Sequence, residues 1–236
     1  MSETKTLKTN KHHNRDYKLK MITILGMLSA LAYVVTFICR LPIIPSVPFL
    51  ELEFKSAIIL IGGFIYGPLA GFAVSVVVCL LEMLSYSSTG FIGFAMNVLA
   101  TAAFVCPAAF VYKKKRALSG AVIGIAIGTI IMTIVMVLWN YIVTPVYMHI
   151  PREAIVPLLL PAFVPFNLIK GALNASATLL LYKFVVKALR KAKLLPKEQK
   201  NDNTQKLGST FVASLLISII VITGCVLAIL AFNGVL

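Results

Sequence analysis

The sequence is poor in acidic residues and in charge of either sign. It holds 8 Asp and Glu against 22 Lys and Arg, and charged residues make up only 13% of its 236 positions. Hydrophobic residues account for 59% of the chain, which is far more apolar surface than one soluble domain of this length can bury. The composition therefore argues against a soluble domain and indicates a chain that lies in a lipid bilayer.

Motifs for common catalytic chemistry are also missing. The chain has no GxxxxGK[ST] phosphate loop, no HExxH zinc-binding pair and no GxSxG nucleophile turn. Its three histidines fall in a tail or a loop, and its four cysteines are scattered singly without CxxC spacing, so neither a metal site nor a disulfide framework is indicated. We expect no catalytic residues, no metal, no cofactor and no enzyme activity, and ATP hydrolysis would have to come from another protein.

Long apolar runs are what the chain has in abundance. Several approach or exceed the roughly 20 residues that a helix needs to cross the hydrocarbon core of a bilayer. Because these runs are continuous rather than alternating in polarity, helices are favoured over a barrel. The runs are Met21–Cys39, Phe91–Val111, Gly120–Ile142, Phe163–Val186 and Ser209–Phe232.

The basic residues gather at the ends of the apolar runs. One group precedes Met21, a second is Lys113–Arg116, and a third lies between Lys183 and Lys206. By the positive-inside tendency all three groups face the cytoplasm, and so does the N-terminus. The net charge of +14 thus has a topological explanation, and since the basic groups lack interleaved aromatic residues we do not expect nucleic-acid binding.

The stretch Ser56–Ser85 is either one tilted helix or two short ones. A single span would put Lys113–Arg116 outside, whereas a break at Gly67 and Pro68 returns all basic groups to one side. We therefore predict an all-α membrane protein, a compact six-helix transmembrane bundle with one additional C-terminal transmembrane helix. The predicted helices are about 21–39, 56–67, 69–85, 91–112, 118–146, 158–187 and 209–232.

The same pattern divides the chain into four parts. They are a cytoplasmic basic tail at 1–20, the six-helix core at 21–190, a cytoplasmic linker at 191–208 and the extra helix at 209–232. The second core helix is too short to cross a bilayer alone, so its neighbours must shield it. The proline-rich outer segment Arg40–Lys55 is either a lid over a cavity or a plain surface loop.

Polar residues inside one apolar run are the main functional signal. Asn167, Lys170 and Asn174 recur at helical spacing and share a face. A lysine at membrane depth costs a few kcal/mol and usually faces a polar interior or a ligand pathway, although this one lies near enough to the helix end to reach the interface instead.

Other polar groups lie at a similar depth. Asn140 is near the outer end of its helix, and Asn97 lies about two turns into another. An amide offers both donors and an acceptor, which suits a neutral heterocycle, but Asn97 and Asn174 are also explained as bonds between helices. Glu82 pairs with Lys55 or Arg40 or reaches water, and we assign it no function.

Two stripes of small residues allow helices to approach closely. Gly120, Gly124 and Gly128 are spaced for internal packing. Gly26 and Ala30 have the same spacing on the first helix, where they serve either internal packing or contact with another membrane protein.

Four stretches together resemble a known family. GGFIYGPLAGF (62–72), SSTGFIGFAMN (87–97), LWNYIVTPVYM (138–148) and PFNLIKGALNA (165–175) occur in the order and spacing seen in the membrane-embedded S components of energy-coupling factor (ECF) vitamin transporters. The chain is most similar to the riboflavin-specific branch. The likeness covers about residues 18–190 and leaves out the last helix.

The resemblance implies a subunit of the cell membrane that captures riboflavin, the transported ligand, from outside. It implies that Asn140, Asn167 and Lys170 hydrogen-bond the flavin ring system, and that Thr89 and Gly90 line the pocket. It also implies partners, namely a transmembrane coupling protein, met by the Gly26 and Ala30 stripe, and two cytoplasmic ATPases. This chain reads ELEFKS at residues 51–56, where the family often has an Asp-containing stretch, so the resemblance assigns that loop a lid role without a specific contact.

A second interpretation is a stand-alone secondary transporter driven by an ion gradient. Such a protein ordinarily shows paired charges deep in the bundle and an inverted repeat. The charges within the predicted spans are Glu82, Lys170 and the near-terminal Lys183, and no repeat is evident. An intramembrane enzyme ranks last, because the sequence offers no nucleophile with a matching base.

Overall fold

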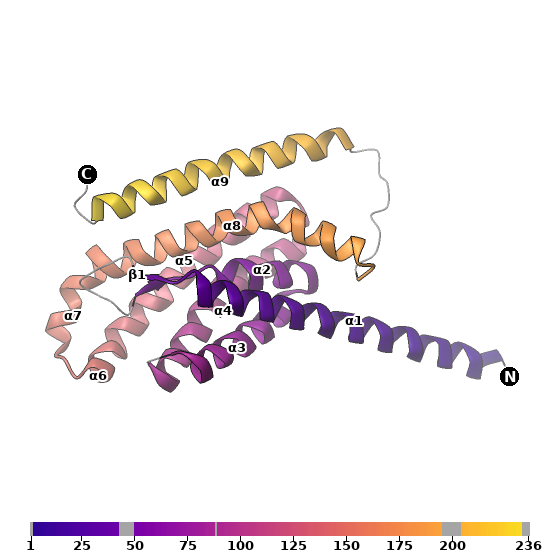
Figure 1. Ribbon diagram of the computed structural model, residues 1–236, viewed down its shortest axis with the longest axis horizontal. Helices are drawn as coiled ribbons and strands as arrows, with labels where there is room; N and C mark the ends of the chain where they lie inside the picture. The colour runs from indigo at the N-terminus through magenta and orange to yellow at the C-terminus, as the bar shows by residue number, and fades with distance from the viewer. Residues whose placement is uncertain (1, 43–49, 88, 195–203, 233–236) are drawn as a thin grey trace.

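The computed structural model describes residues 2–42, 50–87, 89–194 and 204–232. Within these ranges long helices run side by side as an elongated bundle, and the N-terminal part of the first helix projects beyond it (Figure 1). The long helices are α1 (Ser2–Ile38), α3 (Pro68–Ser85), α4 (Gly90–Lys114), α5 (Leu118–Ile142), α8 (Val164–Lys191) and α9 (Thr204–Phe232).

Five helical segments of the described ranges are long and apolar enough to cross a membrane. Two further helices are apolar but shorter, α2 (Lys55–Tyr66) and the part of α9 at Leu215–Ala231. The five longer segments are Arg15–Ile38, Pro68–Ser85, Gly90–Lys114, Leu118–Ile142 and Arg152–Lys191.

The predicted break between the second and third helices is confirmed. Helix α2 ends at Tyr66, Gly67 follows with a φ of +98°, and Pro68 begins α3. Glycine adopts this positive φ without the steric cost of a Cβ, and proline fits the first turn of a helix because its missing N–H has no partner there. The two residues thus end one helix and start the next.

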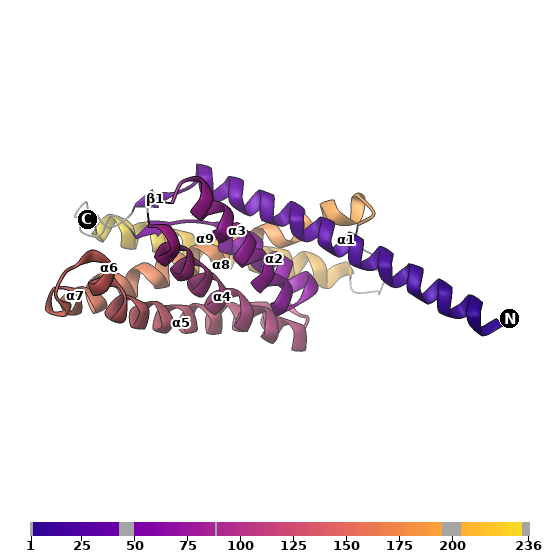
Figure 2. The same ribbon diagram turned by 90° about the horizontal axis from the view of Figure 1, so that it is seen from below.

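The short α2 lies in the centre of the bundle. It packs against α1, α3, α4 and α8, and every residue from Lys55 to Phe64 is buried. Seen from below, α1 and α3 lie on the near side of α2 (Figure 2). The prediction that neighbouring helices shield this short helix is therefore confirmed, and its backbone hydrogen bonds are kept away from lipid.

Close approach of helices depends on the small residues. A Cβ on Gly71 would lie 2.6 Å from Cγ1 of Val105 and 3.3 Å from Cα of Gly63, so α2, α3 and α4 meet at glycine. Gly124 and Gly128 likewise lie against the backbone carbonyls of α4. The internal packing role predicted for the stripe from Gly120 to Gly128 is confirmed.

The region before α8 differs from the prediction. The predicted helix 118–146 ends at Ile142. The predicted helix 158–187 lies within a longer helical run, Arg152–Lys191, of which α8 begins only at Val164. Between Ile142 and Val164 lie α6 (Thr144–Met148), α7 (Arg152–Leu158) and a π-helical turn, η1 (Leu159–Phe163). Proline explains the interruptions, because Pro145, Pro157 and Pro161 each lack the N–H that a continuous helix needs.

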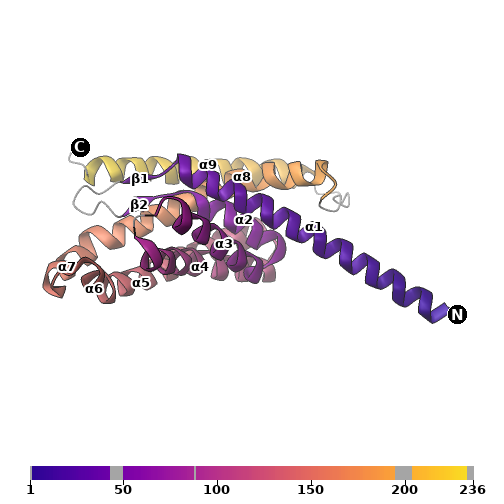
Figure 3. The same ribbon diagram turned by 60° about the horizontal axis from the view of Figure 1, so that its bottom comes forward.

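The segment after α1 forms a short antiparallel pair, β1 (Leu41–Pro42) and β2 (Glu51–Leu52), in which Leu41 pairs with Leu52. Figure 3 shows both strands beside the ends of the helices. We call the described residues from Arg40 to Phe54 the strap; positions 43–49 lie outside the described residues. Helix α9 packs along α8, where Ser218 Oγ donates to the Ser176 carbonyl at 3.4 Å.

Candidate substrate-binding site

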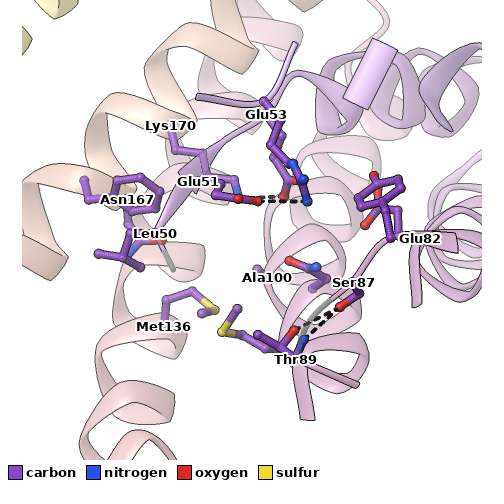
Figure 4. Close-up of a pocket in the computed structure, with 15 residues that line it drawn as sticks. Leu50, Glu51, Glu53, Glu82, Ser87, Thr89, Ala100, Met136, Asn167 and Lys170 are labelled. Atoms are coloured by element: carbon purple, nitrogen blue, oxygen red, sulfur yellow. Dashed lines mark hydrogen bonds and ion pairs between the residues drawn. The ribbon is translucent and has the colours of Figure 1, made fainter. Parts of the chain in front are cut away.

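A cavity of about 330 Å³ opens at one end of the bundle (Figure 4). It lies where α1, α3 and α5 end and where α2, α4 and α8 begin. The strap covers it from one side, and Figure 4 shows Asn167 and Lys170 of α8 across from Glu82 and Ser87. Basic residues Lys113–Arg116 and Lys187–Lys191 lie at the other end of these helices, so the cavity and the basic groups occupy opposite ends.

Part of the cavity wall is apolar. Leu50 of the strap, Met96 and Ala100 of α4, Met136 of α5 and Phe166 of α8 all line it. Leu50, Met136 and Phe166 are each only 4% exposed, so they are held in place by the surrounding core. Such walls suit a flat, largely apolar ring, since burying its faces supplies most of the binding free energy.

A buried cluster of four charges adjoins this apolar wall, in which Glu53, Glu82 and Lys170 line the cavity and Lys55 lies behind them. Glu53 of the strap accepts from Lys170 Nζ at 2.7 Å through Oε1 and from Lys55 Nζ at 2.8 Å through Oε2. Lys55 also donates to Glu82 Oε2 at 2.5 Å. All four residues are at most 9% exposed, and their two positive and two negative charges balance. Mutual pairing is what makes such burial tolerable, because an isolated ion would lose its hydration without compensation.

The position of Glu53 sets its ionisation. Burial by itself raises the pKa of a carboxyl group, but the Lys170 and Lys55 ammonium groups outweigh it and lower the pKa of Glu53 to about 2. Glu53 is therefore a carboxylate at neutral pH, and the strap is tied by charge to both α8 and the start of α2.

Both the oxygen and the nitrogen of the Asn174 side-chain amide make hydrogen bonds that fix the strap and the start of α2. Its Nδ2 donates to the carbonyls of Glu53 and Lys170, both at 2.9 Å, and its Oδ1 accepts from the Ala57 N–H at 2.9 Å. That N–H belongs to the first turn of α2, where intrahelical acceptors are absent. The structure thus supports the helix-bonding interpretation of Asn174, which does not line the cavity.

Three of the residues singled out from the sequence reach the cavity with polar groups. Lys170 and Asn167 line it from α8, and Asn97 lines it from α4. Asn167 donates through Nδ2 to the Phe163 carbonyl at 2.8 Å, which leaves Oδ1 for another donor. Within the described ranges no hydrogen bond engages the Asn97 amide, so both its ends are available.

The Ser-Thr-Gly loop contributes one of its two predicted residues. Thr89 lines the cavity and shares a hydrogen bond of 3.0 Å with Ser87. Gly90 adopts a φ of +56° and starts α4, but it is not among the lining residues. Its contribution is to turn the chain into α4, which places Thr89 at the cavity edge.

The structure does not bring Asn140 to the cavity wall. Its side chain is fully buried, donating to the Met136 carbonyl at 2.7 Å and accepting from Thr144 Oγ1 at 2.9 Å. The bond from Thr144 bridges the junction of α5 and α6, and Met136, one turn earlier, lines the cavity in place of Asn140. Contact between Asn140 and a ligand stays a prediction.

Sequence reasoning assigned no site role to Glu53, Lys55, Glu82 or Tyr86. The predicted pairing of Glu82 with Lys55 is confirmed, but its place in the cavity wall came from the fold. The sequence offered Glu53 and Lys55 at the start of one apolar helix and Glu82 near the end of the next. These positions do not predict the contacts, because the path of the strap decides which of the charges meet.

The stripe on α1 faces away from the bundle. Gly26 and Ala30 are both exposed, and no atom lies within 4 Å of where a Cβ on Gly26 would be placed. Within the described residues, the interpretation of this stripe as an internal packing surface is therefore wrong. The interpretation that remains is contact with lipid or with another membrane protein.

The family model for the ECF transporter substrate-specific component matches residues 20–182. The chain belongs to this family. It is 36% identical to the riboflavin transporter RibU of Staphylococcus aureus (strain TCH60), an alignment that covers 75% of this chain and 96% of the relative. It is 32% identical to the riboflavin transporter FmnP of Bacillus subtilis (strain 168), covering 65% and 85% respectively.

A solved structure, that of the S component of a bacterial ECF transporter, superposes on this substrate-specific component. The TM-score is 0.63 at 36% identity, with 73% of this chain and 98% of the other covered. This substrate-specific component is thus a multi-pass membrane protein of a transporter family and not a member of an enzyme family. Helix α9 lies beyond the family match, which ends at residue 182.

Proposed function

We propose that this protein is the riboflavin-binding subunit of an ECF-type importer. The observation that carries the proposal is the cavity, in which Asn97, Asn167 and Lys170 accompany apolar walls formed by residues such as Met136 and Phe166. Its volume of about 330 Å³ lies at the lower end of the range typical of small-molecule sites. Relatives named riboflavin transporters in several bacteria support the choice of ligand.

The flavin ring system matches the chemistry of this wall. Its pyrimidine-like edge alternates C=O and N–H groups, which the Oδ1 of Asn167 and both ends of the Asn97 amide complement. Lys170 donates a hydrogen bond to an acceptor on the ring. To do so, it gives up part of its hydrogen bonding to Glu53. The apolar side chains cover the ring faces. Thr89 and Gly90 edge the entrance, and Asn140 reaches the ring after a local rearrangement at the start of α6.

Orientation and partners complete the proposal. The cavity end faces the outside and the basic end faces the cytoplasm, in accordance with the positive-inside tendency. The N-terminal tail and the linker at 191–208 are then cytoplasmic, and α9 crosses the membrane beside the core. Gly26 and Ala30 form a surface for a transmembrane coupling protein, which itself binds two cytoplasmic ATPases that drive release of the ligand.

The test is a titration of riboflavin with the purified protein. Bound flavin should lose its fluorescence through contact with the cavity wall, and Lys170→Ala, Asn167→Ala and Asn97→Ala should each weaken binding. Asn10→Ala, in the tail, is the matched control and should bind as the unmodified chain does. Absence of quenching at micromolar protein would exclude the proposed ligand.

One observation favours a second candidate, the ion-coupled secondary transporter. The buried cluster of Glu53, Lys55, Glu82 and Lys170 supplies the paired charges that such a protein requires. Uptake of riboflavin into vesicles that contain this chain alone, driven by an imposed proton gradient, would support that candidate. We expect uptake only when the coupling protein, the ATPases and ATP are present.

A further inference from the structure

We infer that Glu82 and Tyr86 recognise hydroxyl groups on the side chain of the ligand. The inference rests on the proposed function and assigns a role to two residues that the ring-binding groups leave unused. Both residues line the cavity, and Glu82 lies across it from Asn167 and Lys170 (Figure 4). A ring bound at Asn167 and Lys170 therefore directs its substituent toward the wall formed by the end of α3.

Two oxygens on this wall lack partners. Glu82 Oε1 and Tyr86 Oη are buried, and neither has a hydrogen-bond partner among the described residues. Leaving a buried polar atom unsatisfied costs about 1–3 kcal/mol, so two such atoms on residues that line a binding cavity indicate a missing donor or acceptor. The two residues are one helical turn apart, and the Tyr86 N–H donates to the Glu82 carbonyl at 3.1 Å, so they present one combined site.

Tyr86 is held in position by aromatic neighbours. Its ring lies 6.1 Å from that of Tyr33 and 5.8 Å from that of Phe37, both on α1. The Arg40 guanidinium lies 4.6 Å from the centre of the same ring. The arginine side chain is about one-third exposed, so it is the group free to move aside when a ligand reaches the tyrosine oxygen.

The charges of the cavity select a neutral group. Lys55 and Lys170 match Glu53 and Glu82, and Arg40 lies 3.3 Å from Glu51, so each carboxylate on the wall already has a cation. A phosphate or an ammonium group placed here would add an unmatched buried charge. A hydroxyl donates to Glu82 Oε1 and exchanges a hydrogen bond with Tyr86 without changing the balance, and riboflavin carries several hydroxyls on its ribityl chain.

The experiment compares riboflavin with lumiflavin, which keeps the ring system but has a methyl group in place of the ribityl chain. Dissociation constants for both are measured by flavin fluorescence in the full chain and in Tyr86→Phe and Glu82→Gln. We expect Tyr86→Phe to weaken riboflavin binding about three- to tenfold and Glu82→Gln about tenfold, with lumiflavin affinity unchanged in both. Tyr141→Phe and Glu153→Gln, at exposed positions outside the cavity, are the matched controls.

The ratio of the two affinities separates recognition from a structural role. If both flavins weaken equally, or neither does, the inference is overturned while the proposed function stands. If the unmodified chain binds neither flavin, the proposed function fails. Should Glu82→Gln fail to fold because Lys55 loses a charge partner, Tyr86→Phe decides the matter, since it removes one oxygen and leaves the ion cluster intact.

Discussion

Lys170 of α8 donates to Glu53 of the strap at 2.7 Å, and this contact joins two segments that lie 117 residues apart in the sequence. The same ammonium group lines the cavity. One side chain therefore serves both the closure of the strap and the proposed binding of the ring. A ligand that engages Lys170 competes with Glu53, so strap position and occupancy of the cavity are coupled.

Removing the Glu53 charge should destabilise the protein. Glu53→Gln leaves Lys55 and Lys170 with too little compensating charge, and breaking a buried pair in this way costs about 3 kcal/mol. Glu51→Gln is the matched control, because the Glu51 ion pair with Arg40 is partly exposed and should be worth less than about 1 kcal/mol. The measurement is the free energy of unfolding in detergent micelles, and equal losses in the two variants would contradict the burial argument.

The Glu53 contribution should depend on pH in one direction. Because the pKa of Glu53 is lowered from 4.5 to about 2, its stabilisation is complete above pH 4.5 and disappears as the pH falls to about 2. The difference in unfolding free energy between the unmodified chain and Glu53→Gln should therefore be about 3 kcal/mol near pH 6 and shrink in acid. A difference that stays constant over this range would show that Glu53 is not held as a carboxylate by its neighbours.

Substitutions of Asn174 and Asn97 should distinguish a residue needed for stability from a residue needed for riboflavin binding. Asn174→Ala removes three hydrogen bonds, two of which fix the strap and the start of α2, so we expect a loss of about 2–3 kcal/mol in unfolding free energy. Asn97→Ala removes no hydrogen bond within the described residues and should leave stability within about 0.5 kcal/mol while weakening riboflavin binding about tenfold. The reverse pattern, with Asn97 needed for stability, would remove it from the proposed site.

A larger side chain should lower the melting temperature in one of the two small-residue stripes and leave it unchanged in the other. Gly128→Val places a side chain against the Phe104 carbonyl and should prevent folding or lower the melting temperature strongly. Gly26→Val meets open space and should leave the melting temperature unchanged. Under the proposed function, Gly26→Val should instead reduce co-purification with the coupling protein, and full retention of that partner would exclude α1 as the docking surface.

Much of the fold follows from local patterns. Apolar length locates the membrane helices, and the charge groups together with Gly67 and Pro68 predict the break between α2 and α3. The segment from Thr144 to Phe163 could not be predicted so well, because proline near a helix start is compatible with continuation, a kink or a new helix. Only the tertiary packing decides among them.

The candidate site could likewise be predicted only in part. Helical spacing placed Asn167 and Lys170 on a common face, but it also grouped Asn174 with them, and Asn174 turned out to hold the strap. The outer position of Asn140 pointed toward the same end of the bundle, yet its amide is used by its own helix junction. The partners of Glu53 and Glu82 depend on where the strap crosses α8, which is a long-range contact without a sequence period.

A structure of this protein with riboflavin bound would locate the flavin itself. We expect the ring in the cavity between the strap and α8, with its polar edge on Asn167 and Lys170, its faces against apolar side chains such as Met136 and Phe166, and its ribityl chain toward Glu82. A flavin bound at another surface, or bound here with Lys170 still joined only to Glu53, would contradict this expectation.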